Sequence, residues 1–135
     1  MGFELDNRQF EILDMLVGFN TESPPGRNTD PLQDEIESLL RDLGFSIQRE
    51  HLYDNDSVIV ATLKGEDSNA PKLILNGHVD VASVDDDQYW QYPPFQLTEV
   101  YGWLYGRGVS DMKGGMSSLF YVPVSYTHLT LPTTP

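Results

Sequence analysis

The apolar run at residues 72–76, with the Gly77-His78-Val79-Asp80 sequence that follows it, constrains the fold more than any other feature of the chain. Such a run predicts a strand that is covered on both faces. Open α/β sheets present their ligands at strand ends, so we expect His78 and Asp80 at such an end. Because side chains alternate along an extended backbone, these two side chains should emerge on the same side. The spacing fits a metal-bound imidazole oriented by a carboxylate, and it also fits a structural histidine beside a turn aspartate.

A glycine-rich stretch at residues 106–115 supplies a second carboxylate, Asp111, just before a helix of small residues. Gly106 and Gly108 allow a tight turn, which can bring Asp111 back toward the sheet edge. The glycine pair that ends the stretch disfavours a helix and indicates backbone held close to a neighbouring group. No Gly-Lys-Ser/Thr follows, so a phosphate cradle is the weaker interpretation of this stretch.

Hydrophobic periodicity and turn signals predict the rest of an α/β fold. We expect one helix capped by Asp6 that extends to about Phe19, and a second with Asp30 as its N-cap and Pro31 as its first residue that ends at Gly44. Further elements are expected as strands at 45–53 and 57–63 that form an antiparallel hairpin, a second hairpin at 96–105, and a last helix from about 111 to 121. This order indicates an α/β sandwich with a mixed sheet.

The composition narrows the classes of function. The net charge of −13 argues against a nucleic-acid partner, because phosphate neutralisation requires Lys and Arg. No apolar run approaches the roughly 20 residues of a membrane span, and the acidic N-terminus does not look like a secretory signal. We therefore expect a cytoplasmic protein without a membrane partner. The chain has no cysteine, so any metal must be held by His and carboxylate side chains.

The last residues differ in character from the rest of the chain. From Val124 onward the sequence lacks a helical period and abruptly loses its acidic residues. It resembles the translated read-through of a sequencing adapter, so we predict that residues 123–135 are a non-native tail. The native part is then residues 1–122, and His128 is neither a ligand nor a catalyst.

Three segments together resemble the M20 metallopeptidase family: residues 77–81, the Trp90…Pro94-Phe95 segment, and residues 104–115. The family includes acetylornithine deacetylase, succinyl-diaminopimelate desuccinylase and carboxypeptidase relatives. The resemblance implies a zinc-peptidase-like catalytic domain, which is a three-layer α/β/α sandwich with a mixed sheet, present here in truncated form. It implies that His78 binds one of two zinc ions, that Asp111 bridges both, and that Asp80 is a catalytic residue that orients His78. Cobalt is an alternative to zinc, and the Asp111–Met112 peptide bond is expected to be cis.

The resemblance further implies a cytosolic amidohydrolase that cleaves the amide bond of a small-molecule N-acyl amino acid. Within the family the motifs look most like acetylornithine deacetylase, an enzyme of arginine biosynthesis. A dipeptidase or carboxypeptidase with a short peptide substrate, a homodimeric parent, and a non-catalytic α/β binding domain stay open. The family's Glu-Glu pair and its later ligands are not found here, so we expect an inactive N-terminal fragment.

Several other side chains could bind a metal or a substrate, and for each we weigh a structural role. We expect His51 at the surface and the acidic run at residues 85–87 in a solvated loop without the glycine of an EF-hand. Trp90 packs over its loop or lines a substrate entrance. Arg107 anchors a substrate carboxylate or holds its own glycine turn, and Lys113 is expected to form a structural ion pair.

Overall fold

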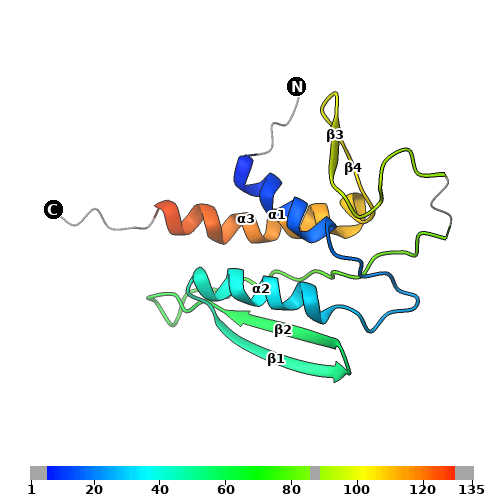
Figure 1. Cartoon of the computed structure of the whole chain (residues 1–135). Helices are drawn as coiled ribbons and strands as arrows, with labels where there is room; N and C mark the ends of the chain where they lie inside the picture. The colour runs from blue at the N-terminus through cyan, green and yellow to red at the C-terminus, as the bar shows by residue number, and fades with distance from the viewer. Residues whose placement is uncertain (1–5, 86–88, 130–135) are drawn as a thin grey trace.

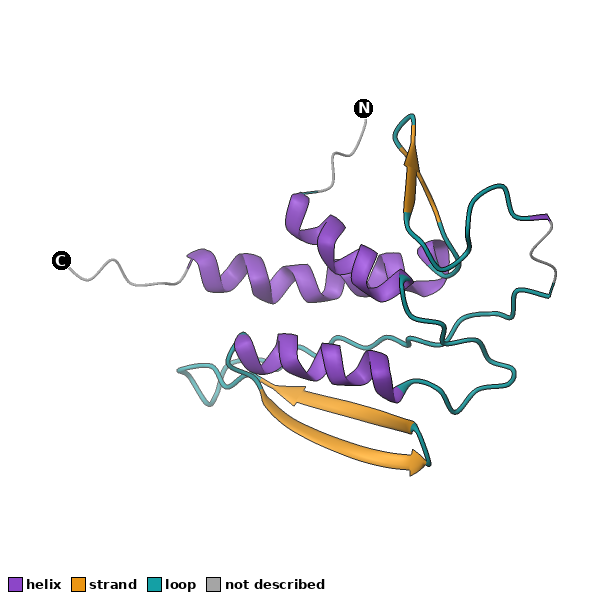
Figure 2. Ribbon diagram, viewed as in Figure 1, coloured by secondary structure: helices purple, strands orange, loops and turns teal. Residues whose placement is uncertain are grey.

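The computed structural model describes residues 6–85 and 89–129, and its helices and hairpins are arranged around one extended segment (Figures 1 and 2). The elements in chain order are α1 (Asn7–Val17), α2 (Asp30–Asp42), β1 (Ser46–Tyr53), β2 (Asp56–Thr62), β3 (Thr98–Val100), β4 (Trp103–Tyr105), the kinked turn η2 (Val109–Lys113) and α3 (Gly114–Leu129). This α/β class agrees with the prediction from the sequence.

The first two helices begin and end close to the residues predicted from the sequence, and the start of α2 differs. Asp6 caps α1, and its side chain accepts a hydrogen bond from the Arg8 N–H at 2.8 Å. Helix α2 begins at Asp30, with Thr29 in the N-cap position, so Asp30 is its first residue and not its cap. Gly44 follows α2 with a φ of +88°, the left-handed conformation expected of a helix-ending glycine.

The strands form two antiparallel hairpins. β1 pairs with β2 from Ser46 opposite Thr62 onward, and β3 pairs with β4 around the Tyr101-Gly102 turn, so both predicted hairpins are confirmed. In the described residues, parallel pairing is limited to a single bridge between Glu22 and Val81.

The prediction of a strand at residues 72–76 was wrong for this structure. These residues form no ladder within the described part of the chain, and Leu73 and Ile74 are 79% and 86% exposed. A strand needs a neighbour that takes up its backbone hydrogen bonds, and within the described part of the chain β2 pairs only with β1. The apolar run alone therefore does not fix the local structure.

The core lies along the extended segment that leads to His78. Figure 1 shows this segment running between α2 on one side and the α1–α3 pair on the other. Its buried Val79 belongs to the same core cluster as Leu16 of α1, Leu32 of α2 and Phe120 of α3. The backbone around His78 is thus held by three helices, while its polar side chains reach solvent.

Helix α3 is longer than the sequence pattern indicates. It continues past Tyr121 and through Pro123 to Leu129, and Val124 is buried in the core. The expectation that helical structure stops before Val124 was therefore wrong, while the adapter origin of residues 123–135 stays a prediction. None of the described helices is long and apolar enough to cross a bilayer.

Candidate metal centre

The two sequence motifs converge on one imidazole. The Nε2 atom of His78 lies 3.2 Å from Oδ1 of Asp111, and its Nδ1 atom lies 3.1 Å from Oδ1 of Asp80. All three side chains are exposed. The His78 ring thus lies between the carboxylate of Asp80, two residues later in the sequence, and that of Asp111, which comes from a distant turn. The sequence motifs predicted this arrangement.

Direct contacts hold the Asp111 turn against the His78 segment. The backbone N–H of His78 points to Sδ of Met112 at 3.4 Å, next to the cis Asp111–Met112 peptide bond that the family resemblance predicted. Gly108 opens the turn with a φ of +83°, and a Cβ atom there would lie 2.5 Å from Cγ1 of Val81. The glycine is therefore required both by its conformation and by the close approach of the two segments.

A second close approach fixes the start of the His78 motif. A Cβ atom on Gly77 would lie only 2.2 Å from Sδ of Met116, which is buried on α3. The backbone immediately before His78 therefore rests on the helix that follows Asp111. Gly77, to which the sequence pattern assigned no role, permits this contact.

The donor types in this cluster fit a divalent metal such as zinc, but their number is small. Metal–ligand bonds of about 2.0–2.2 Å at tetrahedral angles place two ligand atoms roughly 3.3 Å apart. The 3.2 Å between His78 Nε2 and Asp111 Oδ1 matches that spacing, and it suits a hydrogen bond equally well. No group of three or more candidate ligands occurs in the described residues. The geometry is thus compatible with His78 and Asp111 as two candidate ligands of one ion, and Asp80 lies on the other side of the ring.

Lys113 is the most deeply buried polar side chain near the site. Its side chain is fully buried, and Nζ donates a hydrogen bond to the Phe19 carbonyl at 2.8 Å. Burial lowers the pKa of the Lys113 ammonium to about 8. The predicted ion pair was wrong, because in the described residues the partner of Nζ is a backbone carbonyl and not a carboxylate.

The loop before the glycine turn is organised by Arg107. Its guanidinium lies over the Trp90 ring at 4.9 Å and donates to the Ser83 carbonyl at 3.3 Å, while its backbone N–H donates to Pro94. This geometry favours the interpretation in which Arg107 holds its own turn. Ser83 also donates to Asp85, and the other two residues of the acidic run lie outside the described residues.

A separate charged cluster on α2, β1 and β2 is structural. Arg49 pairs with Asp30 at 3.1 Å and with Asp34 at 2.6 Å, and Ser57 donates to Asp30 at 2.5 Å. Desolvation raises the pKa of Asp30, but the hydrogen bonds from Ser57 and Arg49 outweigh it and leave that pKa below its ordinary value. His51 is exposed, as predicted, and lies 3.4 Å from Asp30.

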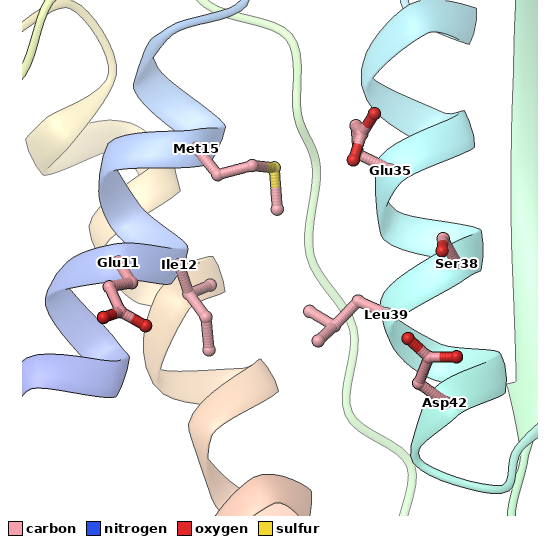
Figure 3. Close-up of a pocket in the computed structure, with 7 residues that line it drawn as sticks. All are labelled: Glu11, Ile12, Met15, Glu35, Ser38, Leu39 and Asp42. Atoms are coloured by element: carbon pink, nitrogen blue, oxygen red, sulfur yellow. The ribbon is translucent and has the colours of Figure 1, made fainter.

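A groove of about 280 Å³ lies between α1 and α2 (Figure 3). Its lining mixes apolar and acidic side chains: Glu11, Ile12, Met15, Glu35, Ser38, Leu39 and Asp42. None of the residues of the His78 cluster lines it, so this groove is separate from the candidate metal centre.

Comparison with known proteins relates the chain to one group of enzymes. Residues 74–128 match the model of peptidase family M20/M25/M40. The chain is 45% identical over 112 residues to N-formyl-4-amino-5-aminomethyl-2-methylpyrimidine deformylase of Bacillus subtilis, covering 82% of this chain and 26% of that protein. It is 54% identical over 52 residues to a probable succinyl-diaminopimelate desuccinylase of Staphylococcus aureus, covering 38% of this chain and 13% of that protein.

The fold also has a solved counterpart. The crystal structure of human carnosine dipeptidase 1 superposes with a TM-score of 0.74 at 26% identity, covering 90% of this chain and 28% of that chain. The chain therefore spans about a quarter of the length of the deformylase and of the dipeptidase.

Proposed function

Since this chain is a member of peptidase family M20, matched over residues 74–128, we propose that it is the N-terminal part of a metal-dependent amidohydrolase. The observation that carries the proposal is the 3.2 Å approach of His78 Nε2 to Asp111 Oδ1, from motifs far apart in the sequence. Hydrolysis of amide bonds is the chemistry that the deformylase, desuccinylase and dipeptidase names have in common.

Each residue of the cluster has a distinct role in this proposal. His78 would hold a metal ion through Nε2, and Asp111 would be the carboxylate shared by two ions, zinc or cobalt. Asp80 accepts the Nδ1–H of His78, which fixes the tautomer that leaves Nε2 free for the metal. The metal, when bound, polarises an amide carbonyl and lowers the pKa of a water molecule.

The substrate that we propose is a short-chain N-acyl amine. The deformylase and desuccinylase names support loss of a small acyl group, and acetylornithine-type deacetylation, with its place in arginine biosynthesis, is one case of this class. The likeness to carnosine dipeptidase 1 favours dipeptide hydrolysis as the second candidate. A cytoplasmic location and a homodimeric parent stay predictions.

Metal binding by this chain tests the proposal directly. Cobalt(II) added to the purified chain should give visible absorption bands, and His78→Ala or Asp111→Asn should abolish them. His51→Ala is the matched control, because that exposed imidazole pairs with Asp30 and is not in the cluster. An unchanged cobalt spectrum in His78→Ala would contradict the assignment.

Activity is expected only from the longer parent protein. The described residues offer two metal ligands where a catalytic zinc needs about three protein ligands, so this chain should not turn over substrate. The parent should hydrolyse N-formyl, N-acetyl or N-succinyl amines faster than dipeptides, and a chelator should abolish hydrolysis. Faster dipeptide hydrolysis would select the second candidate, and chelator-resistant hydrolysis would refute metal dependence.

A further inference from the structure

We propose that residues 19–23 form a clamp that holds the His78 and Asp111 segments in register, with Thr21 and Lys113 as positioning residues. The inference rests on the proposed function of the site. It assigns a role to two buried side chains that are not themselves proposed metal ligands.

The first half of the clamp grips the His78 segment. Thr21 is 1% exposed, and its Oγ1 donates to the Val79 carbonyl at 2.6 Å, at the peptide bond between Val79 and Asp80. The N–H of Val81 donates back to the Thr21 carbonyl at 3.0 Å, and the Ser23 N–H donates to the Val81 carbonyl at 2.8 Å. The backbone that carries Asp80 is thus fixed to the clamp on both sides of that residue.

The second half grips the Asp111 turn. Lys113, two residues after Asp111, is fully buried and donates from Nζ to the Phe19 carbonyl at 2.8 Å. Its own N–H donates to the Gly108 carbonyl at 2.7 Å, which closes the turn. An ammonium group is costly to bury, and a methionine of similar length would fill the space without that cost. A lysine here is better explained by the carbonyl that it holds than by packing.

The two halves are linked by a very short piece of chain. Phe19 and Thr21 are separated by one residue, so the contact with the Asp111 turn and the contact with the His78 segment cannot move independently. Glu22 stiffens the link, because its carboxylate accepts from the Asn20 side chain at 2.8 Å and from the Val84 N–H at 2.5 Å. A shift of the clamp would therefore change the distance between the ligands, and metal sites tolerate only about 0.5 Å of such displacement.

Thr21 provides the sharper test. Thr21→Val keeps the shape and removes the hydroxyl, so cobalt(II) affinity of the chain should fall by about 10-fold, as when other supporting groups of metal sites are lost. Thr21→Ser should restore binding because it retains the donor. The matched control is Thr98→Val, which removes an exposed hydroxyl that donates to the Gln96 carbonyl on the β3–β4 hairpin. Equal cobalt affinity in folded Thr21→Val and in the unsubstituted chain would overturn the proposal.

A double-mutant cycle tests whether both halves act through one link. Lys113→Met should also weaken cobalt binding, and its effect should be much smaller in a Thr21→Val background, because the shared clamp is already released. Fully additive losses would show two independent contacts and would overturn the clamp.

A measurement without metal separates this inference from the proposed function. The ¹⁵N chemical shift of His78 Nε2 should respond to Asp111→Asn in the unsubstituted chain, because the two groups are 3.2 Å apart. In Thr21→Val that response should be lost. Persistence of the response would refute the clamp even if cobalt binds. If the response is lost as expected but cobalt does not bind the unsubstituted chain, the clamp stands and the metal assignment fails.

Discussion

Gly108→Ala should destabilise the chain by about 2–5 kcal/mol, because two separate costs meet at this position. Its φ of +83° is a left-handed conformation, which costs an alanine about 1–2 kcal/mol. The new Cβ would also lie 2.5 Å from Cγ1 of Val81, and overpacking of this kind costs about 1–3 kcal/mol. Urea unfolding followed by circular dichroism gives the free energy of unfolding, provided that the slope with urea is unchanged.

Gly44→Ala is the matched control for Gly108→Ala. Gly44 has a φ of +88°, but a Cβ there would have no heavy atom within 4 Å, so only the conformational cost of about 1–2 kcal/mol applies. Replacing glycine by alanine also lowers the conformational entropy of the unfolded chain. This stabilises both variants by a similar amount, so it cancels in the comparison. If Gly108→Ala were no more destabilising than Gly44→Ala, the inferred contact between the Asp111 turn and the His78 segment would be wrong.

Two further predictions concern stability away from the site. Leu16→Ala should cost about 2–5 kcal/mol by urea unfolding, because Leu16 is fully buried, while Leu52→Ala on the exposed face of β1 should change stability by about 0.5 kcal/mol or less. The pKa of Asp30 is lowered because hydrogen bonds from Ser57 and Arg49 outweigh desolvation, so its stabilisation is present above the unfolded pKa and is lost as pH falls through the folded one. The free energy of unfolding measured at decreasing pH below the ordinary value of 3.8 should therefore fall more steeply in the unsubstituted chain than in Asp30→Asn, and parallel curves would contradict this.

Elements governed by neighbours in the sequence could be predicted, and those governed by distant partners could not. The Asp6 cap, the Gly44 stop and both hairpins depend on contacts within a few residues. The start of α2 was misplaced by one residue, because the Asp30 carboxylate is taken up by Arg49 and Ser57 and does not cap the helix. The strand expected at residues 72–76 requires a pairing partner, which no local pattern can supply.

The candidate site shows the same division. His78, Asp80 and Asp111 could be proposed from the sequence because imidazole and carboxylate are common metal ligands and these residues stand in recognisable motifs. The contacts of Thr21 and Lys113 could not be predicted because their partners are the backbone carbonyls of Val79 and Phe19, which have no signature in a sequence. For Lys113 an ion pair was predicted instead.

The contrast in exposure explains how an open cluster can keep a defined geometry. Asp111 is 86% exposed at its side chain, and water competes for each of its hydrogen bonds, so the 3.2 Å contact with His78 contributes little to holding the ligands together. By contrast, the residues that hold this part of the backbone are buried: Val79, Thr21 and Lys113. Hydrogen bonds shielded from water are costly to break, because each leaves a buried donor or acceptor without a partner. The position of the proposed ligands is therefore set by buried residues. Substitutions of those residues should change the affinity of the site for a metal ion, although they do not contact the ion.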